Sequence, residues 1–182
     1  YPTLKRALEL DPDNHVILLN FSISAIETNK FAEAEVANKR GLSVTPGYYL
    51  TWGRLYTAYL YQGGREKDID DLVKEIESFT NKNREIYNVL VHYYRKRNPE
   101  KFQKYISEAR SYEETIKGYY IDQYQLLDGD FSKYMDESEK AFEIKKLQYA
   151  FGVEAFGAHF FIGENRDNPR YKALVEKFRK GR

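Results

Sequence analysis

The most informative stretch of the chain is GLSVTPGYYLTWGRLYTAYLYQGG, residues 41–64, because it repeats the pattern of residues 7–30 at a distance of 34 positions. Apolar, small and turn-forming positions recur together. The matched pairs are Leu8 with Leu42, Leu10 with Val44, Pro12 with Pro46, Leu18 with Trp52, Phe21 with Leu55 and Ala25 with Tyr59. A period of this length is typical of proteins built from stacked helical hairpins.

Further units follow along the chain with small shifts of register. The pattern of Trp52, Leu55 and Tyr59 recurs 35 positions later as Tyr87, Leu90 and Tyr94, and a fourth unit is indicated near Phe131 and Phe142. Within each unit the apolar spacing is helical, and turn residues such as 11–14 (Asp-Pro-Asp-Asn) and 45–47 (Thr-Pro-Gly) separate the helices. Each unit is therefore predicted to be helix, turn, helix.

These positions resemble the signature of the tetratricopeptide repeat family. The residues that carry the resemblance are Leu18, Phe21, Ser22, Ala25, Phe31, Ala34, Gly41 and Pro46, and in the next unit Trp52, Leu55, Tyr56 and Tyr59. The resemblance implies an all-α fold, a right-handed α-α superhelix of about four helical hairpins over residues 1–146, the first unit being truncated at its start. A C-terminal capping segment of helices is expected over residues 147–182.

The end of the chain differs from the repeats. Residues 160–178 resemble the segment that closes such arrays in bacterial signalling and transcription-regulatory proteins, with Asn168 capping a helix that begins at Pro169. Because the chain also starts at Tyr1 without methionine or an apolar signal segment, we expect it to be the C-terminal part of a larger protein of that kind.

Composition excludes several classes of function. The 182 residues carry 29 Lys+Arg against 28 Asp+Glu, so the net charge of +1 provides no global attraction for nucleic acid. No apolar stretch reaches the length of about 20 residues that a membrane span needs. The absence of cysteine excludes disulfides and thiolate chemistry. We expect a cytoplasmic protein that binds neither membrane nor nucleic acid directly.

Motifs for catalysis are absent from the sequence. His15, His92 and His159 lie too far apart to form a metal pair on one helix. Gly63-Gly64 lacks the Lys-Ser or Lys-Thr of a phosphate loop and is interpreted as a helix-helix turn. We therefore predict a protein with no catalytic residue, metal or cofactor.

The predicted function is protein–protein interaction, with a peptide or partner protein bound in the concave groove of the superhelix. Asn88, His92 and Arg95 share one helix face by their spacings of four and three, so together they could hold a carboxylate or backbone amides. The full set of candidate groove residues is Asn88, His92, Arg95, Thr57, Tyr119 and Gln123.

Two alternatives remain open from the sequence. One is a self-association domain that forms a homodimer through faces rich in tyrosine, such as Tyr48, Tyr49, Tyr56 and Tyr61. The other is a small-molecule sensor with a pocket beside residues 148–162, where glycines interrupt regular helix.

Overall fold

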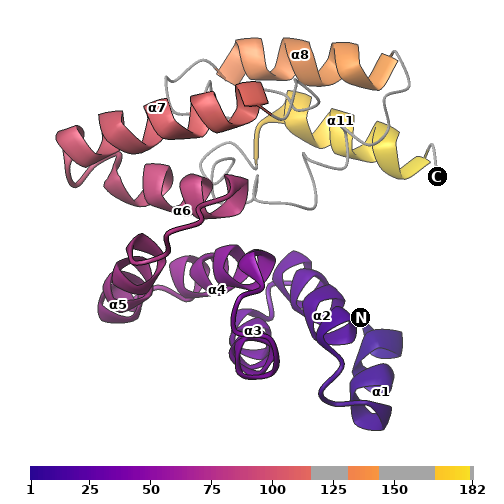
Figure 1. Ribbon diagram of the computed structural model, residues 1–182. Coiled ribbons are helices and arrows are strands. Elements are labelled where there is room, and N and C mark those ends of the chain that lie inside the picture. The colour runs from indigo at the N-terminus through magenta and orange to yellow at the C-terminus, as the bar shows by residue number, and fades with distance from the viewer. Residues whose placement is uncertain (116–130, 144–166, 181–182) are drawn as a thin grey trace. The chain divides into compact units, whose positions relative to one another are not determined.

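The fold is all-helical wherever the computed structural model describes the chain, which is over residues 1–115, 131–143 and 167–180. No strand occurs in these residues, so the all-α prediction is confirmed. The helices are α1 (Pro2–Leu10), α2 (His15–Glu27), α3 (Phe31–Val44), α4 (Tyr49–Gln62), α5 (Glu66–Glu77), α6 (Arg84–Tyr94), α7 (Pro99–Thr115), α8 (Phe131–Glu143) and α11 (Pro169–Lys180) (Figure 1).

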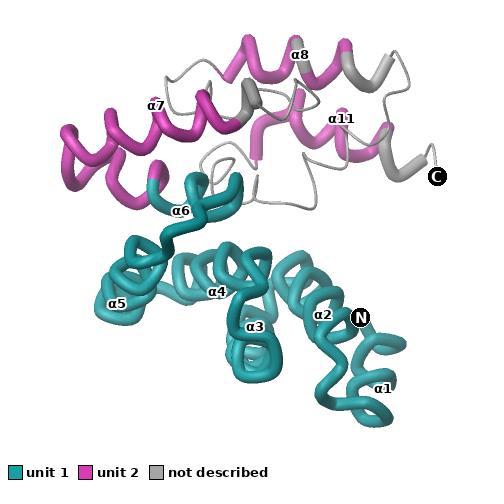
Figure 2. The backbone as a smooth tube through the Cα atoms, viewed as in Figure 1, with its two compact units in different colours: residues 1–90 teal, residues 91–182 magenta. Residues whose placement is uncertain are grey.

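The chain forms two compact units, Tyr1–Leu90 and Val91–Arg182 (Figure 2). The boundary falls inside α6, so this helix contributes residues to both units. The boundary predicted from the sequence, between residues 146 and 147, lies outside the described residues.

The predicted turns and caps are present. The Asn14 side chain accepts hydrogen bonds from the backbone N–H groups of Val16 and Ile17 at 3.1 and 3.2 Å, which caps α2. Gly63 and Gly64 adopt φ of 69° and 64° between α4 and α5, a left-handed turn that favours glycine. In the second unit the side chain of Asn168 accepts from Arg170 N at 2.9 Å at the start of α11.

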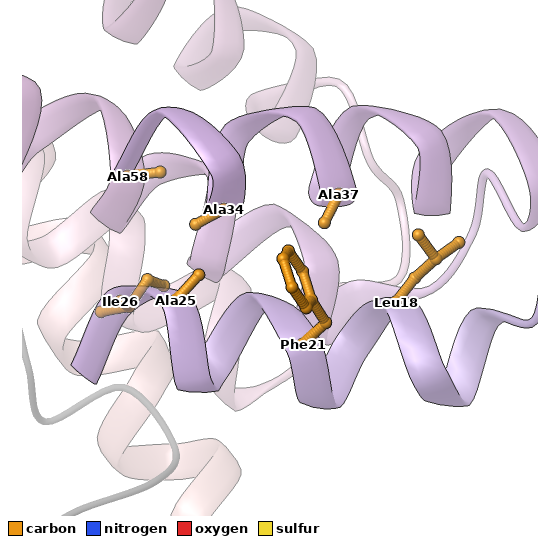
Figure 3. Packing of buried hydrophobic residues seen from close by; sticks show 7 residues of the cluster. All are labelled: Leu18, Phe21, Ala25, Ile26, Ala34, Ala37 and Ala58. Carbon is orange, nitrogen blue, oxygen red and sulfur yellow. The ribbon is translucent and has the colours of Figure 1, made fainter. Parts of the chain in front are cut away.

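One apolar cluster of the first unit lies between α2 and α3 and reaches α4 (Figure 3). Phe21 and Leu18 of α2 point toward α3, where Ala34 and Ala37 are small enough to let the two helices approach closely. Figure 3 also shows Ala58 of α4 beside this cluster. The 34-residue pattern is therefore realised as helices that pack on their neighbours in sequence, α2 on α3 and α3 on α4.

Helix α4 is the most enclosed helix of the first unit. Every residue from Thr51 to Tyr59 is buried, and the Trp52 ring meets Phe79 edge-on with ring centroids 5.2 Å apart. A helix that is buried on all sides has neighbours on all sides. Trp52 therefore lies in the core.

An ion-pair network joins α3 to the start of α5. The Arg65 guanidinium binds both carboxylate oxygens of Glu35, at 2.7 and 2.9 Å, and donates to Asp68 at 2.7 Å. Gln62 and Lys39 also donate to Glu35, at 2.9 and 2.7 Å. These hydrogen bonds, led by that from Arg65, lower the pKa of Glu35 to about 2. The network fixes the turn at Gly63-Gly64 against α3.

In the second unit a similar ion pair holds α11 on α8. The Arg170 guanidinium binds both oxygens of Glu139 at 2.8 Å and also contacts Asp136. Leu174 of α11 is buried. One arginine therefore ties the last described helix to a helix about 30 residues earlier.

Replacing Arg170 by alanine should loosen α11 selectively. Its hydrogen bonds to Glu139 and Asp136 are lost, and the buried Leu174 side chain stays in place. We expect amide hydrogen exchange in residues 169–180 to accelerate by about tenfold while α5 is unchanged. Lys172→Ala is the matched control, because Lys172 is exposed and pairs with the exposed Asp167. Equal exchange in the two variants would contradict a holding role for Arg170.

Candidate functional site

Four polar side chains are buried where the start of α6 lies against α4. Arg54 and Thr57 come from α4, and Glu85 and Asn88 come from α6. We call them the inner polar cluster. The backbone approach is close, because a Cβ added at Gly53 would lie 3.1 Å from Oε2 of Glu85. Glycine at this position therefore leaves room for the Glu85 carboxylate.

Burial shifts both ionisable groups of the inner polar cluster toward their neutral forms. Loss of hydration raises the pKa of Glu85 to about 7, although the charges of Arg84 and Arg54 act in the opposite direction. Loss of hydration also lowers the pKa of Arg54 to about 10, which leaves the guanidinium charged at neutral pH. Arg54 donates to the backbone carbonyl of Leu19 at 3.2 Å. The cluster therefore links α6 through α4 to α2.

The structure separates the residues that the sequence grouped as one binding face. Asn88 is 0% exposed and Thr57 is 4% exposed, and the Thr57 hydroxyl donates to Gly53 O at 2.8 Å. His92 is half-buried and Arg95 is exposed. Because α4 and α6 pack together here, Asn88 and Thr57 are positioned as packing residues and do not face solvent. Helical spacing shows that residues share a face, but it does not show which other helix covers that face.

Two other candidate residues, Tyr119 and Gln123, lie outside the described residues. The tyrosines proposed for self-association also differ in their exposure to solvent. Tyr56 is fully buried, and Tyr61 is half-buried and stacked on Phe31 with centroids 5.3 Å apart. Tyr49 is exposed, and Tyr48 contacts it and His15 at centroid distances of 5.6 and 5.5 Å.

An open apolar groove of about 450 Å³ lies in the first unit, bounded by α1 and α3 with α2 as its floor. We call it the α1–α3 groove. Its apolar lining is Leu8, Pro12, Leu18, Phe21, Ala32, Val36 and Ala37. Val36 is 68% exposed although it is a large apolar residue, so the groove offers an apolar contact that the chain itself leaves uncovered.

The rim of the α1–α3 groove carries both signs of charge. Lys5 and Glu9 come from α1, and Glu33 and Arg40 come from α3. Glu33 accepts a hydrogen bond from the Tyr1 hydroxyl, which lowers the pKa of Glu33 and helps to raise that of Tyr1 to about 12. Arg40 pairs with Asp13 at 2.8 Å. These contacts fix the groove walls at the start of the chain.

Sequence reasoning missed the α1–α3 groove. Its walls come from residues 5–9 and 32–40. These residues lie on α1 and α3, which occupy the same position in successive repeat units. The signal available was Val36, a large apolar residue beside the exposed charged residues Lys39 and Arg40. The candidate groove residues predicted from the sequence that the structure describes, such as Thr57 on α4 and Asn88 on α6, do not line this groove.

No group of three or more histidine or acidic side chains that could hold a metal occurs in the described parts of the chain. Among the helices described, none combines the length and the apolar character that a bilayer span requires. Comparison with known proteins gives no match to a protein-family model, to a curated protein or to a solved structure.

Proposed function

We propose that this chain is a non-catalytic helical-repeat module of the tetratricopeptide type, which binds a segment of a partner protein. The observation that carries the proposal is the α1–α3 groove, an open apolar surface between two helices of a repeat array. The repeat period and the closing segment support a place within a larger signalling or transcription-regulatory protein, as the resemblance implies.

The shape and chemistry of the groove favour an amphipathic helix as the bound segment. Two helices bound it and a third forms its floor, which is the arrangement into which a further helix can insert its apolar face. A volume of about 450 Å³ lies within the range of pockets that take up several side chains. Lys5, Glu9 and Arg40 on the rim would face the polar side of such a helix.

A negative charge placed in the α1–α3 groove should strongly weaken this binding. We expect Val36→Glu to weaken binding by at least about tenfold, because it places a carboxylate against the apolar face of the ligand. The variant should fold normally, since Val36 is already largely exposed. The measurement is fluorescence polarisation with labelled peptides selected from a displayed peptide library on the wild-type protein.

Val44→Glu is the matched control, because Val44 is also exposed on α3 but does not line the groove. The selected peptides should show apolar residues at helical spacing and should bind Val44→Glu as well as they bind the wild type. Peptides that bind wild type and Val36→Glu equally would refute the groove as the binding site.

A specific observation also favours self-association as a second candidate function. Leu10, Val16, Val44 and Tyr49 are exposed around the α1–α2 and α3–α4 connections. The Arg40–Asp13 ion pair and the His15–Tyr48 ring contact hold these two connections side by side. Sedimentation equilibrium at high micromolar concentration tests this function, and a monomer there would exclude it.

A further inference from the structure

A strongly basic corner lies in the second unit, where α6 ends and α7 begins. Residues 95–104 contain five basic side chains and one acidic one, a net charge of +4 in a chain whose total is +1. The remaining residues therefore carry a net charge of −3. The basic residues of this corner are Arg95, Lys96, Arg97, Lys101 and Lys104. The charge is concentrated on the α6–α7 connection and the first turns of α7 and does not reflect the chain as a whole.

Tyrosine rings hold several of these cations in place. The Arg97 guanidinium lies 4.4 Å from the centroid of the Tyr93 ring and donates to Tyr93 O at 3.0 Å. Lys101 lies 4.6 Å from the Tyr94 ring centroid and donates to its hydroxyl at 2.9 Å. A cation held on an aromatic face keeps its charge and loses less side-chain freedom when a ligand binds. The corner is thus partly preorganised.

The outermost cations are open to a ligand. Arg95, Arg97 and Lys104 are exposed, and within the described residues none of the three forms a salt bridge. Asn98 accepts from Lys101 N at 3.0 Å and caps α7, so the turn that carries the cations has a fixed backbone.

We propose that this corner is an electrostatic docking site for an acidic peptide segment of a partner protein, rich in aspartate and glutamate. Arginines bind carboxylates through paired hydrogen bonds, and Arg95 and Arg97 supply two such groups on one turn. The site is independent of the α1–α3 groove, because it lies in the other unit and uses charge where the groove uses apolar contact.

The aromatic contacts favour a peptide over single-stranded nucleic acid. Nucleic-acid sites of this kind stack bases on open aromatic faces. Here the Tyr94 ring is stacked on Tyr105 with centroids 5.7 Å apart and has Lys101 over it, and Arg97 covers Tyr93. These rings are therefore already engaged with the cations and with Tyr105.

The test uses the whole chain and a fluorescein-labelled peptide of twelve alternating Asp and Glu residues. We expect binding at low salt that weakens as salt increases. The triple variant Arg95→Glu, Arg97→Glu and Lys104→Glu should weaken it by at least about tenfold. The control variant Arg6→Glu, Lys67→Glu and Lys74→Glu changes the net charge equally at exposed sites in the first unit and should bind like wild type. Circular dichroism checks that both variants fold.

Three outcomes would overturn the inference. One is the absence of peptide binding at low salt, and another is equal weakening in the two triple variants, which would indicate a general effect of net charge. The third is tighter, corner-dependent binding of a single-stranded oligothymidine of equal length. Loss of groove binding in Val36→Glu would leave this result unchanged, so the two proposals can fail separately.

Discussion

Replacing Trp52 by alanine should lower the free energy of unfolding by about 3–5 kcal/mol, the usual cost of removing a large buried ring. The side chain is 5% exposed on the most enclosed helix of the first unit, and it packs edge-on against Phe79 beyond the end of α5. Its loss leaves a cavity between helices that cannot collapse easily, because α4 is buried on every side. Because the total stability of a domain is only about 5–15 kcal/mol, a loss of this size should leave the variant largely unfolded at elevated temperature.

Urea denaturation followed by circular dichroism measures this effect, because the variant lacks the single tryptophan of the chain. Trp52→Phe distinguishes the contribution of the ring volume to stability from that of the indole N–H. Within the described structure the buried Nε1 atom has no hydrogen-bond partner, so phenylalanine removes an uncompensated polar group while keeping most of the ring. We expect Trp52→Phe to cost much less than Trp52→Ala.

Tyr49→Ala provides the matched control, because Tyr49 lies three residues earlier on the same helix but is exposed. We expect it to cost well under about 1 kcal/mol. If Tyr49→Ala and Trp52→Ala were equally destabilising, Trp52 would not be the anchor that its repeat position implies.

The fold could be predicted from the sequence where the signal was local. The period that pairs Leu18 with Trp52 identified the helices, and Asn14, Gly63 and Asn168 marked their ends, because caps and left-handed turns depend on the residue at one position. The right-handed superhelix remains a prediction, since the order of helices alone does not determine how successive pairs are rotated.

The candidate site was less predictable because its features arise from contacts distant in sequence. Arg54 and Glu85 are 31 residues apart, and no local pattern in the sequence pairs them. Helical spacing correctly placed Asn88 and His92 on α6, but it could not show that α4 packs on the start of that helix. The α1–α3 groove likewise depends on the distance between two helices, which no single segment encodes.

The inner polar cluster leads to the second large prediction, a loss of stability as the pH rises through neutrality. The pKa of Glu85 is raised from 4.5 to about 7 by burial, so the folded chain holds this proton more tightly than the unfolded chain does. For such a group the stabilising contribution is fully present below pH 4.5 and is lost as the pH rises through 7. The contribution of Glu85 to the free energy of unfolding should decline by an amount on the order of 3 kcal/mol.

Other carboxylates change the free energy of unfolding in a lower pH range. The pKa of Glu35 is lowered by its hydrogen bonds to about 2, so its contribution is present above pH 4.5 and is lost as the pH falls toward 2. The pKa of Glu139 is lowered by Arg170, with the same sign. Between pH 4.5 and pH 8 these groups remain ionised. A change in the free energy of unfolding due to Glu85 can therefore be measured there without a contribution from them.

Glu85→Gln tests the assignment because glutamine resembles the protonated acid in shape and charge. At pH 5 the variant should be about as stable as wild type, since Arg54 then faces a neutral side chain in both proteins. At pH 8 the variant should be the more stable protein, because only the wild type must bury an ionised carboxylate. The difference between the two free energies of unfolding as a function of pH isolates Glu85, because every other ionisable group is present in both proteins.

Glu75→Gln is the control for this experiment, since Glu75 is an exposed carboxylate on α5. Its difference curve against wild type should be flat between pH 5 and pH 8. A flat curve for Glu85→Gln as well would mean that Arg54 compensates the Glu85 charge fully at neutral pH. The buried pair would then act as a permanent ionic link between α4 and α6, and the pKa of Glu85 would not be raised in the folded chain.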